Sequence, residues 1–265
     1  MKLLTLNCHS WQEENQEAKI KHLAETIKEK AYDVIALQEV SQSQNGQIVY
    51  DNVKEDNYAY VLLMELEKLG VSDYSLVWDL AHYGYEVLEE GVAILTKHPI
   101  VGRDSFFVSK AEVPTIWKTR KIVGATIEFQ GEPLSFYSCH LGWWGDEEEP
   151  AKYQMEQLLS KFDSKKAFFM GDFNNSAHIR GEGYDFLLKN GFIDTYTAAV
   201  ERDSGVTVEG KIAGWDENKQ DLRIDLILTN FEVSVQSSKV IFNGENKEVV
   251  SDHYGVEVEV LVIAG

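Results

Sequence analysis

Phe168-Phe169-Met170-Gly171-Asp172-Phe173-Asn174 is the stretch that decides the fold, because an apolar run stops there abruptly in turn-forming and polar residues. Such a run predicts a buried strand that ends at the edge of a sheet. Asp172 and Asn174 are two residues apart, so extended backbone projects both side chains to one side. Side by side they could grip a metal-bound phosphate or a water. The alternative is a turn in which both bond only to their own backbone.

Other apolar runs also deliver a polar side chain at their ends. Asn7 closes a strand predicted over 2–7, Glu39 follows a run at 33–37, and His140 ends a run at 134–141. A strand, a helix over 15–30 and a second strand indicate a layered α/β fold. Taken singly, each of these polar residues is more often an ordinary loop group.

Composition limits the class of protein and its partners. Of 265 residues, 44% are hydrophobic and 11% aromatic, enough for a sizeable core. Without an internal repeat, long linker or composition break, the chain is predicted to form one domain over 1–265. Asp and Glu number 44 against 25 Lys and Arg, and the resulting formal charge of −19 disfavours nucleic-acid partners.

The compartment is predicted from apolar runs and cysteines. The apolar core of the first residues is too short for a signal peptide, and nowhere is an apolar run long enough to span a membrane. Cys8 and Cys139 are too few for a secreted disulfide scaffold. We therefore expect a cytoplasmic protein with reduced, buried thiols.

Asp225 and two aromatic segments are further candidates. Asp225 lies in the apolar run 221–228, where it needs a cationic or hydrogen-bonding partner. Trp143 and Trp144 form a Gly-flanked pair typical of an exposed platform for sugar or base rings, core packing being the alternative. The segment 83–86, Tyr-Gly-Tyr-Glu, could form a rim loop, although such aromatics more often pack inside.

Basic side chains are few, so each is a candidate for phosphate contact. Lys118, Arg120 and Lys121 cluster in a strand predicted over 117–130, where a solvated strand face is the commoner interpretation. Arg180 follows the Asp-Phe-Asn loop and could reach a phosphate, whereas most arginines of this kind lie on the surface.

In order and spacing the polar residues resemble the exonuclease–endonuclease–phosphatase superfamily, the metal-dependent phosphoesterases related to pancreatic-type deoxyribonuclease. The matching pieces span nearly the whole chain and are Leu6-Asn7, Leu37-Gln38-Glu39, Glu90-Gly91-Val92-Ala93-Ile94-Leu95, Ser138-Cys139-His140-Leu141, Gly171-Asp172-Phe173-Asn174, Arg223-Ile224-Asp225 and Ser251-Asp252-His253. The resemblance implies a four-layer α/β/β/α sandwich of two packed mixed β-sheets flanked by helices, with the site in strand-end loops. No Gly-x-Ser-x-Gly elbow or zinc-ligand spacing competes with it.

The resemblance implies a metal site. Glu39 corresponds to the principal Mg²⁺ ligand, with Asn7 and Asp252 close by, and Mn²⁺ is expected to substitute. Hard carboxylate oxygens are the ligands that Mg²⁺ takes. Asp172 resembles the residue that positions or deprotonates the attacking water.

The resemblance also implies roles around the phosphoryl group. Asn174 and His140 would hold its oxygens, and Glu90 would orient His140. His253, oriented by Asp225, would act as general acid–base or electrostatic partner. How Asp172 and His253 divide the proton transfers stays open.

Within the superfamily, the chain is similar to bacterial sugar-phosphate phosphatases, and among these to the maltose 6′-phosphate phosphatases, in Leu6-Asn7-Cys8-His9-Ser10-Trp11 and the tryptophan loop. This implies hydrolysis of a small phosphorylated sugar, maltose 6′-phosphate, to free sugar and phosphate. A Mg²⁺-dependent nuclease or another phosphodiesterase is the alternative. We expect no membrane, nucleic-acid or obligatory protein partner. A binding module without activity would have no use for the complete set of family catalytic residues.

Overall fold

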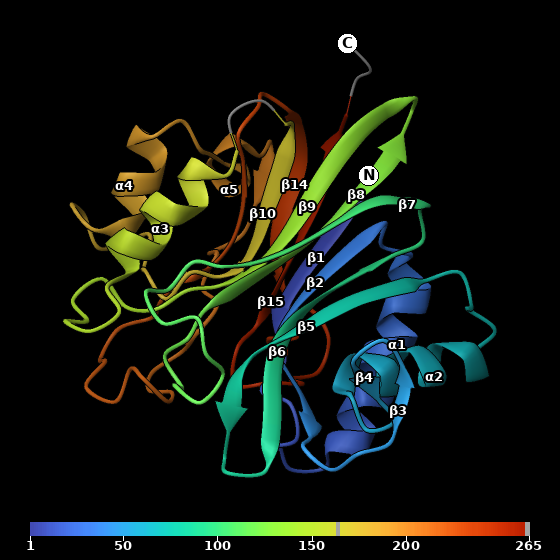
Figure 1. Ribbon diagram of the computed structural model, residues 1–265. Helices are drawn as coiled ribbons and strands as arrows, with labels where there is room; N and C mark the ends of the chain where they lie inside the picture. Colours follow the sequence, from blue (N-terminus) through green and yellow to red (C-terminus); the bar gives the residue numbers. More distant parts are fainter. Residues whose placement is uncertain (163–164, 263–265) are drawn as a thin grey trace.

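Two β-sheets lie face to face between layers of helices in the computed structural model, which describes residues 1–162 and 165–262 (Figure 1). The first sheet contains β1 (Lys2–Asn7), β2 (Val34–Ser43), β5 (Ser75–Gly84), β6 (Leu88–Thr96), β12 (Glu201–Arg202), β14 (Ser234–Ile241) and β15 (Gly255–Leu261), in the spatial order β12-β14-β15-β1-β2-β6-β5. The second contains β7 (Ile100–Phe107), β8 (Lys121–Phe129), β9 (Glu132–His140), β10 (Ala167–Asp172), β11 (Ile193–Asp194) and β13 (Asp225–Thr229), in the order β11-β13-β10-β9-β8-β7.

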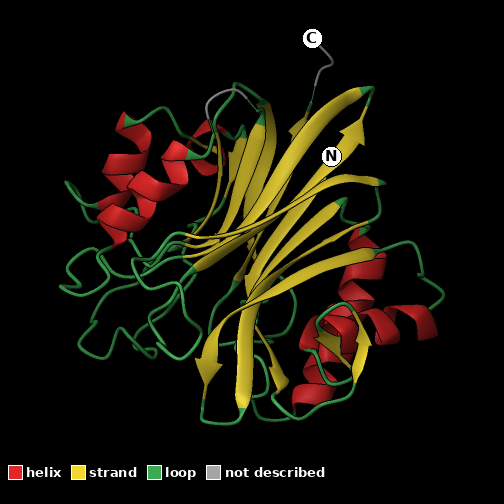
Figure 2. Cartoon of the chain, viewed as in Figure 1, coloured by secondary structure: helices red, strands yellow, loops and turns green. Residues whose placement is uncertain are grey.

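Helices form the two outer layers. They are α1 (Gln16–Lys30), α2 (Tyr58–Lys68), α3 (Ala151–Ser160), α4 (Gly183–Lys189) and α5 (Thr195–Ala198). Figure 2 shows α1 and α2 on one side of the paired sheets and the other helices on the opposite side. The predicted four-layer sandwich is confirmed. None of the helices in the described chain is long and apolar enough to cross a membrane.

Both sheets are built around a parallel pair of strands. β1 and β2 run parallel with α1 between them in the chain, and β9 and β10 run parallel with α3 between them. Antiparallel strands flank each pair, β15 and β6 in the first sheet and β8 and β13 in the second. Because parallel strands end at the same edge of a sheet, each pair presents its polar terminal residues together.

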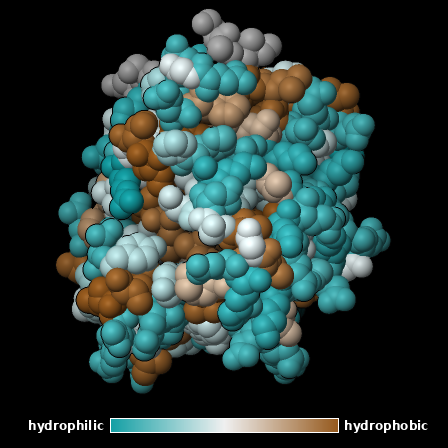
Figure 3. Space-filling view, turned by 90° about the vertical axis from the view of Figure 1, so that its right-hand side faces the viewer, coloured by the Kyte–Doolittle hydropathy of each residue, from teal (hydrophilic) through white to brown (hydrophobic). Residues whose placement is uncertain are grey.

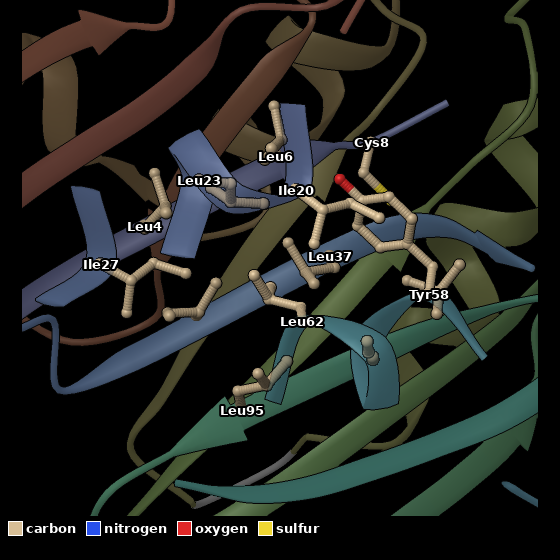
Figure 4. Close-up of a cluster of buried hydrophobic side chains, with 14 of the residues drawn as sticks. Leu4, Leu6, Cys8, Ile20, Leu23, Ile27, Leu37, Tyr58, Leu62 and Leu95 are labelled. Carbon is tan, nitrogen blue, oxygen red and sulfur yellow. The ribbon is translucent and has the colours of Figure 1, made fainter. Parts of the chain in front are cut away.

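The apolar runs read as nearly continuous because both faces of each sheet are buried. Leu3 packs in the core between the sheets, whereas Leu4 and Leu6, on the other face of β1, pack under α1. Figure 4 shows this outer core, in which Leu4 and Leu6 lie with Leu23 and Ile27 of α1. In the core between the sheets, the rings of Phe136 and Phe168 stack at 5.3 Å.

Three predicted segments differ from the structure. The polar, Gln/Asn-rich sequence of residues 41–57 predicts an exposed loop, but β2 continues to Ser43, and residues 48–54 form a hairpin of β3 (Ile48–Tyr50) and β4 (Val53–Lys54). The strand predicted over 117–130 begins at Lys121, and the preceding residues form a turn at the sheet edge. The run 221–228 becomes strand only at Asp225. In each case pairing with a neighbouring strand, rather than local hydrophobicity, sets the boundary.

Candidate active site

A cavity of about 290 Å³ opens where the strand ends of the two sheets meet. The predicted catalytic and metal-binding residues that line it are Glu39, His140, Asp172, Asn174, Asp252 and His253. Asn7 and Asp225 are buried directly behind them and contact lining side chains. The structure therefore brings together all eight residues predicted for these roles.

Asn7 links the acidic groups of the two sheets. Its Nδ2 donates to Glu39 Oε1 at 2.9 Å and to Asp172 Oδ2 at 3.2 Å. Burial, and secondly the charge of Glu90, raise the pKa of Glu39 to about 7, and burial raises that of Asp172 to about 7. Clustered carboxylates with raised pKa values favour a nearby cation. Because their donors are oxygens, this set fits a hard divalent ion.

Two histidines face this acidic group. His253 Nδ1 lies 2.9 Å from Asp225 Oδ2, and its Nε2 lies 3.8 Å from Asp172 Oδ2. Burial alone would lower the pKa of His253, but the charges of Asp225 and Asp172 outweigh it and raise the pKa to about 10. Burial and the neighbouring charge of Arg120 hold the pKa of His140 well below its usual value. The site thus presents one charged and one neutral imidazole.

Local backbone features place the carboxylates. A Cβ at Gly171 would lie 1.9 Å from the carbonyl oxygen of Cys139, so only glycine lets β10 approach β9 so closely just before Asp172. Glu39 lies at a bulge in β2 with φ 53°, and Asn174 has φ 49°. Such left-handed conformations in non-glycine residues are concentrated at functional sites.

Asn174 is held by hydrogen bonds on all sides. Its backbone N–H donates to Asp172 Oδ1 at 2.8 Å, and its Nδ2 donates to the carbonyl oxygen of Leu141 at 3.0 Å. Its Oδ1 accepts from the indole Nε1 of Trp215 at 3.0 Å. Trp215 follows Gly214 in a polar stretch that also contains Gly205 and Gly210, whose composition predicts only a loop or hairpin.

Arg120 places a buried guanidinium in the wall of the cavity. The residue is only 4% exposed and lines the cavity, and its Nη1 donates to the carbonyl oxygen of Trp117 at 3.1 Å. Among the described residues no carboxylate lies within 4.0 Å of its guanidinium, and its Nε has no hydrogen-bond partner. Burial lowers the pKa of Arg120 in spite of the surrounding acidic groups. A buried cation without an ion pair is costly, so this position is suited to an anionic ligand.

Three residues predicted to contact substrate lie outside the cavity. Lys118 Nζ forms ion pairs with Asp146 and Glu148, both at 2.7 Å. Arg180 pairs with Asp185 at 2.7 Å, and 71% of its side chain is exposed.

The third predicted substrate contact outside the cavity is Trp144, whose ring packs against Phe186 of α4. The adjacent Trp143 lines the cavity. Glu90 also differs from expectation, because its carboxylate lies 3.3 Å from Nε2 of His82 and does not orient His140.

Several lining residues were not among the residues predicted for the site. His9 follows the end of β1, His82 lies within β5, and Trp117 precedes β8. The rim loop expected over 83–86 does form part of the cavity wall, through Tyr83, Gly84 and Tyr85.

The comparisons with known proteins agree with this geometry. The sequence profile of the endonuclease/exonuclease/phosphatase family matches residues 4–253. An endonuclease/exonuclease/phosphatase family protein from Leptotrichia buccalis is 44% identical with a TM-score of 0.92, covering 99% of this chain and all (100%) of that chain.

Two other solved structures share the fold at low identity. A mannosyl-6-phosphatase from Bacteroides thetaiotaomicron is 17% identical with a TM-score of 0.71, covering 99% of this chain and 100% of that chain. An endonuclease/exonuclease/phosphatase from Beutenbergia cavernae is 18% identical with a TM-score of 0.70, covering 98% and 71%. A comparison with curated proteins finds no significant match.

Proposed function

The chain belongs to the endonuclease/exonuclease/phosphatase family, and we propose that it is a divalent-metal-dependent phosphatase of a small sugar phosphate, with maltose 6′-phosphate as the expected substrate. The observation that carries this proposal is Arg120, a buried cation without a carboxylate partner in the described chain, at the wall of a small cavity. A phosphate monoester is a compact dianion that could satisfy it. The distant mannosyl-6-phosphatase is in keeping with this substrate class.

Size and charge argue against a polymeric substrate. A cavity of about 290 Å³ is at the lower end of small-ligand pockets. The formal charge of −19 would repel a polyanion, and a nucleic acid would gain little from counterion release without a basic stripe. The buried free thiols of Cys8 and Cys139 are consistent with a cytoplasmic enzyme.

Glu39, Asn7 and Asp252 would hold the metal, for which Mg²⁺ is the expected ion. When bound, it would neutralise charge on the phosphoryl oxygens and lower the pKa of a coordinated water. Asn7 turns its Nδ2 toward Glu39, and its Oδ1 accepts from the backbone N–H of His9 at 3.2 Å, so the second lone pair of Oδ1 is what Asn7 would offer the metal.

The chain's own residues would then move the protons. Asp172, held by Asn7 Nδ2, takes a proton from the attacking water while the oxygen of that water forms the new bond to phosphorus. The bond from phosphorus to the sugar oxygen breaks, and His253 supplies positive charge or a proton to that oxygen. Asp225 occupies His253 Nδ1 and leaves Nε2 for this task. His140 contacts the phosphoryl oxygens, and Arg120 binds the dianion. Asn174, whose amide is already bonded to Leu141 and Trp215, holds Asp172 in place through its backbone N–H.

The test is an activity panel with and without Mg²⁺. It comprises maltose 6′-phosphate, hexose 6-phosphates, a phosphodiester and double-stranded DNA, each assayed also with a chelator. We expect activity on the sugar phosphates that is lost in chelator and restored by Mg²⁺ or Mn²⁺. Higher kcat/KM for DNA than for every sugar phosphate would replace this proposal by the nuclease alternative.

The metal role of Glu39 has a matched control. Glu39→Gln should remove most activity because it removes the negative charge of the metal ligand. It should not unfold the chain, because the side chain lies at a sheet edge and the glutamine amide has the same shape as the carboxylate. Glu132→Gln, an exposed position at the opposite end of β9, should retain full activity. Full turnover by wild type in chelator would contradict the metal mechanism.

A further inference from the structure

Trp117 is exposed at the mouth of the cavity. It is 55% exposed and lines the same cavity as the catalytic residues. Figure 3 shows one face of the molecule, on which hydrophobic patches lie among mainly hydrophilic residues. A single exposed apolar residue is ordinary on a protein surface. An exposed tryptophan that is also part of a cavity wall is a candidate ligand contact.

Hydrogen bonds within the chain hold the turn that carries Trp117. The backbone N–H of Thr119 donates to the carbonyl oxygen of Ile116 at 2.9 Å, and the carbonyl oxygen of Trp117 accepts from Arg120. Lys118 Nζ lies 5.6 Å from the indole centroid and is itself held by two carboxylates. The predicted phosphate ligand Lys118 therefore supports the tryptophan ring instead.

Aromatic side chains from two other segments line the cavity with Trp117. The ring of Trp143 lies 6.2 Å away at an angle of 57°. Gly214 covers part of Trp143, because a Cβ there would approach its ring to 2.3 Å. Tyr85, on the β5–β6 connection, is 58% exposed. Trp117 and Tyr85 thus keep free ring surface at the entrance, whereas Trp143 is partly covered.

We propose that Trp117 is the platform of an outer sugar subsite, which binds the ring of a phosphorylated disaccharide that is more distant from the phosphate. This rests on the proposed function. Arg120, whose Nη1 bonds to the backbone of Trp117, fixes the separation between the phosphate position and this platform. A cavity of about 290 Å³ can hold a phosphate and an adjoining ring, so a second ring extends to the mouth. The axial C–H groups on one side of a pyranose chair form an apolar face that can pack on an indole ring.

The kinetic test compares substrates of increasing length. Trp117→Ala keeps the carbonyl oxygen that anchors Arg120 and removes only the ring. We expect KM for maltose 6′-phosphate to rise about 5- to 10-fold more than KM for glycerol phosphate, with glucose 6-phosphate close to glycerol phosphate. Tyr50→Ala, which removes a 38% exposed aromatic ring outside the cavity wall, serves as control. Equal KM changes for all three substrates would overturn the subsite.

A binding test separates this proposal from the proposed function. Free maltose and adenosine are titrated into wild type and Trp117→Ala in chelator, with heat or tryptophan fluorescence as the readout. Maltose binding that weakens about 5-fold or more in the variant supports the subsite even if no phosphate ester is hydrolysed. Absence of maltose binding by wild type, or tighter binding of adenosine than of maltose, would overturn it.

Discussion

Replacing Arg120 by methionine should separate stability from activity, because the guanidinium is a buried cation that the free protein does not neutralise. Removing such a charge from an apolar site often leaves stability unchanged or raises it. Part of that gain is offset because the variant loses the hydrogen bonds that Nη1 donates to the carbonyl oxygens of Trp117 and Thr119. A hydrogen bond to a charged group contributes about 1.5–3 kcal/mol. We therefore expect the free energy of unfolding of Arg120→Met to stay within about 1 kcal/mol of wild type.

The activity of the same variant should fall sharply. Loss of charge-assisted contacts to a phosphoryl dianion costs about 2–3 kcal/mol, which corresponds to a decrease in kcat/KM of about 30- to 150-fold. Arg120→Lys restores the charge without the planar fork and should lie between the two. Phe107→Leu, a change in a half-buried ring outside the cavity wall, is a control for nonspecific damage near this sheet edge.

Thermal unfolding with and without inorganic phosphate provides the assay. A change of 1 kcal/mol moves Tm by about 2–4 °C in a chain of this size class. Phosphate, in the presence of Mg²⁺, should raise the Tm of wild type and leave that of Arg120→Met nearly unchanged, because ligand binding stabilises only the protein that binds it. The same phosphate-induced rise in both proteins, or an unchanged kcat/KM in the variant, would refute the assignment of Arg120 to the phosphate.

Three other changes test the site and the fold. Asp225→Asn and His253→Ala should lose similar rates, and the double variant little more; additive losses in kcat/KM would show that the two residues act separately. Trp215→Phe removes the N–H bonded to Asn174 Oδ1, so kcat should fall more than KM rises, with no further loss in an Asn174→Ala background. Burial would raise the pKa of Asp33, but hydrogen bonds from the backbone N–H of Lys2 and from His98, together with the charge of Lys97, lower it. The contribution of Asp33 to stability is therefore present above its unfolded pKa and lost as pH falls through its folded pKa. The Tm difference between wild type and Asp33→Asn should thus shrink from neutral pH toward about pH 3, and a constant difference would contradict the pairing.

Residues at strand ends could be predicted from the sequence because local pattern fixes their position. An apolar run that stops in a polar residue places that residue at a sheet edge, as it does for Asn7, His140 and Asp172. Asp225 was expected to have a partner because of burial alone, and His253 supplies it. Which strand ends meet, however, depends on the packing of two sheets, and only the family resemblance indicated that.

Loop side chains could not be predicted in the same way. Trp143 and Trp144 are adjacent, yet Trp143 lines the cavity and Trp144 packs against α4, because a turn directs neighbouring side chains to different sides. Lys118 and Arg180 are occupied by carboxylates that no local pattern connects to them. Trp117 was counted as part of a strand, and its exposure results from where β8 finds its pairing partners.

The matching topology of the two sheets makes the active site a junction between two copies of one structural unit. Each unit is an antiparallel pair, a strand, a helix, a parallel strand and a second antiparallel pair: β14–β15, β1, α1, β2, β5–β6 in one, and β7–β8, β9, α3, β10, β11–β13 in the other.

Asn7 and His140 close equivalent strands of these units, and each reaches the carboxylate on the opposite unit: Asn7 bonds to Asp172, and His140 Nε2 lies 3.9 Å from Glu39. Because both units contribute to the site, a displacement of one sheet along the other would separate these contacts while leaving each sheet intact. Turnover therefore reports on the alignment of the two units more directly than on the stability of either.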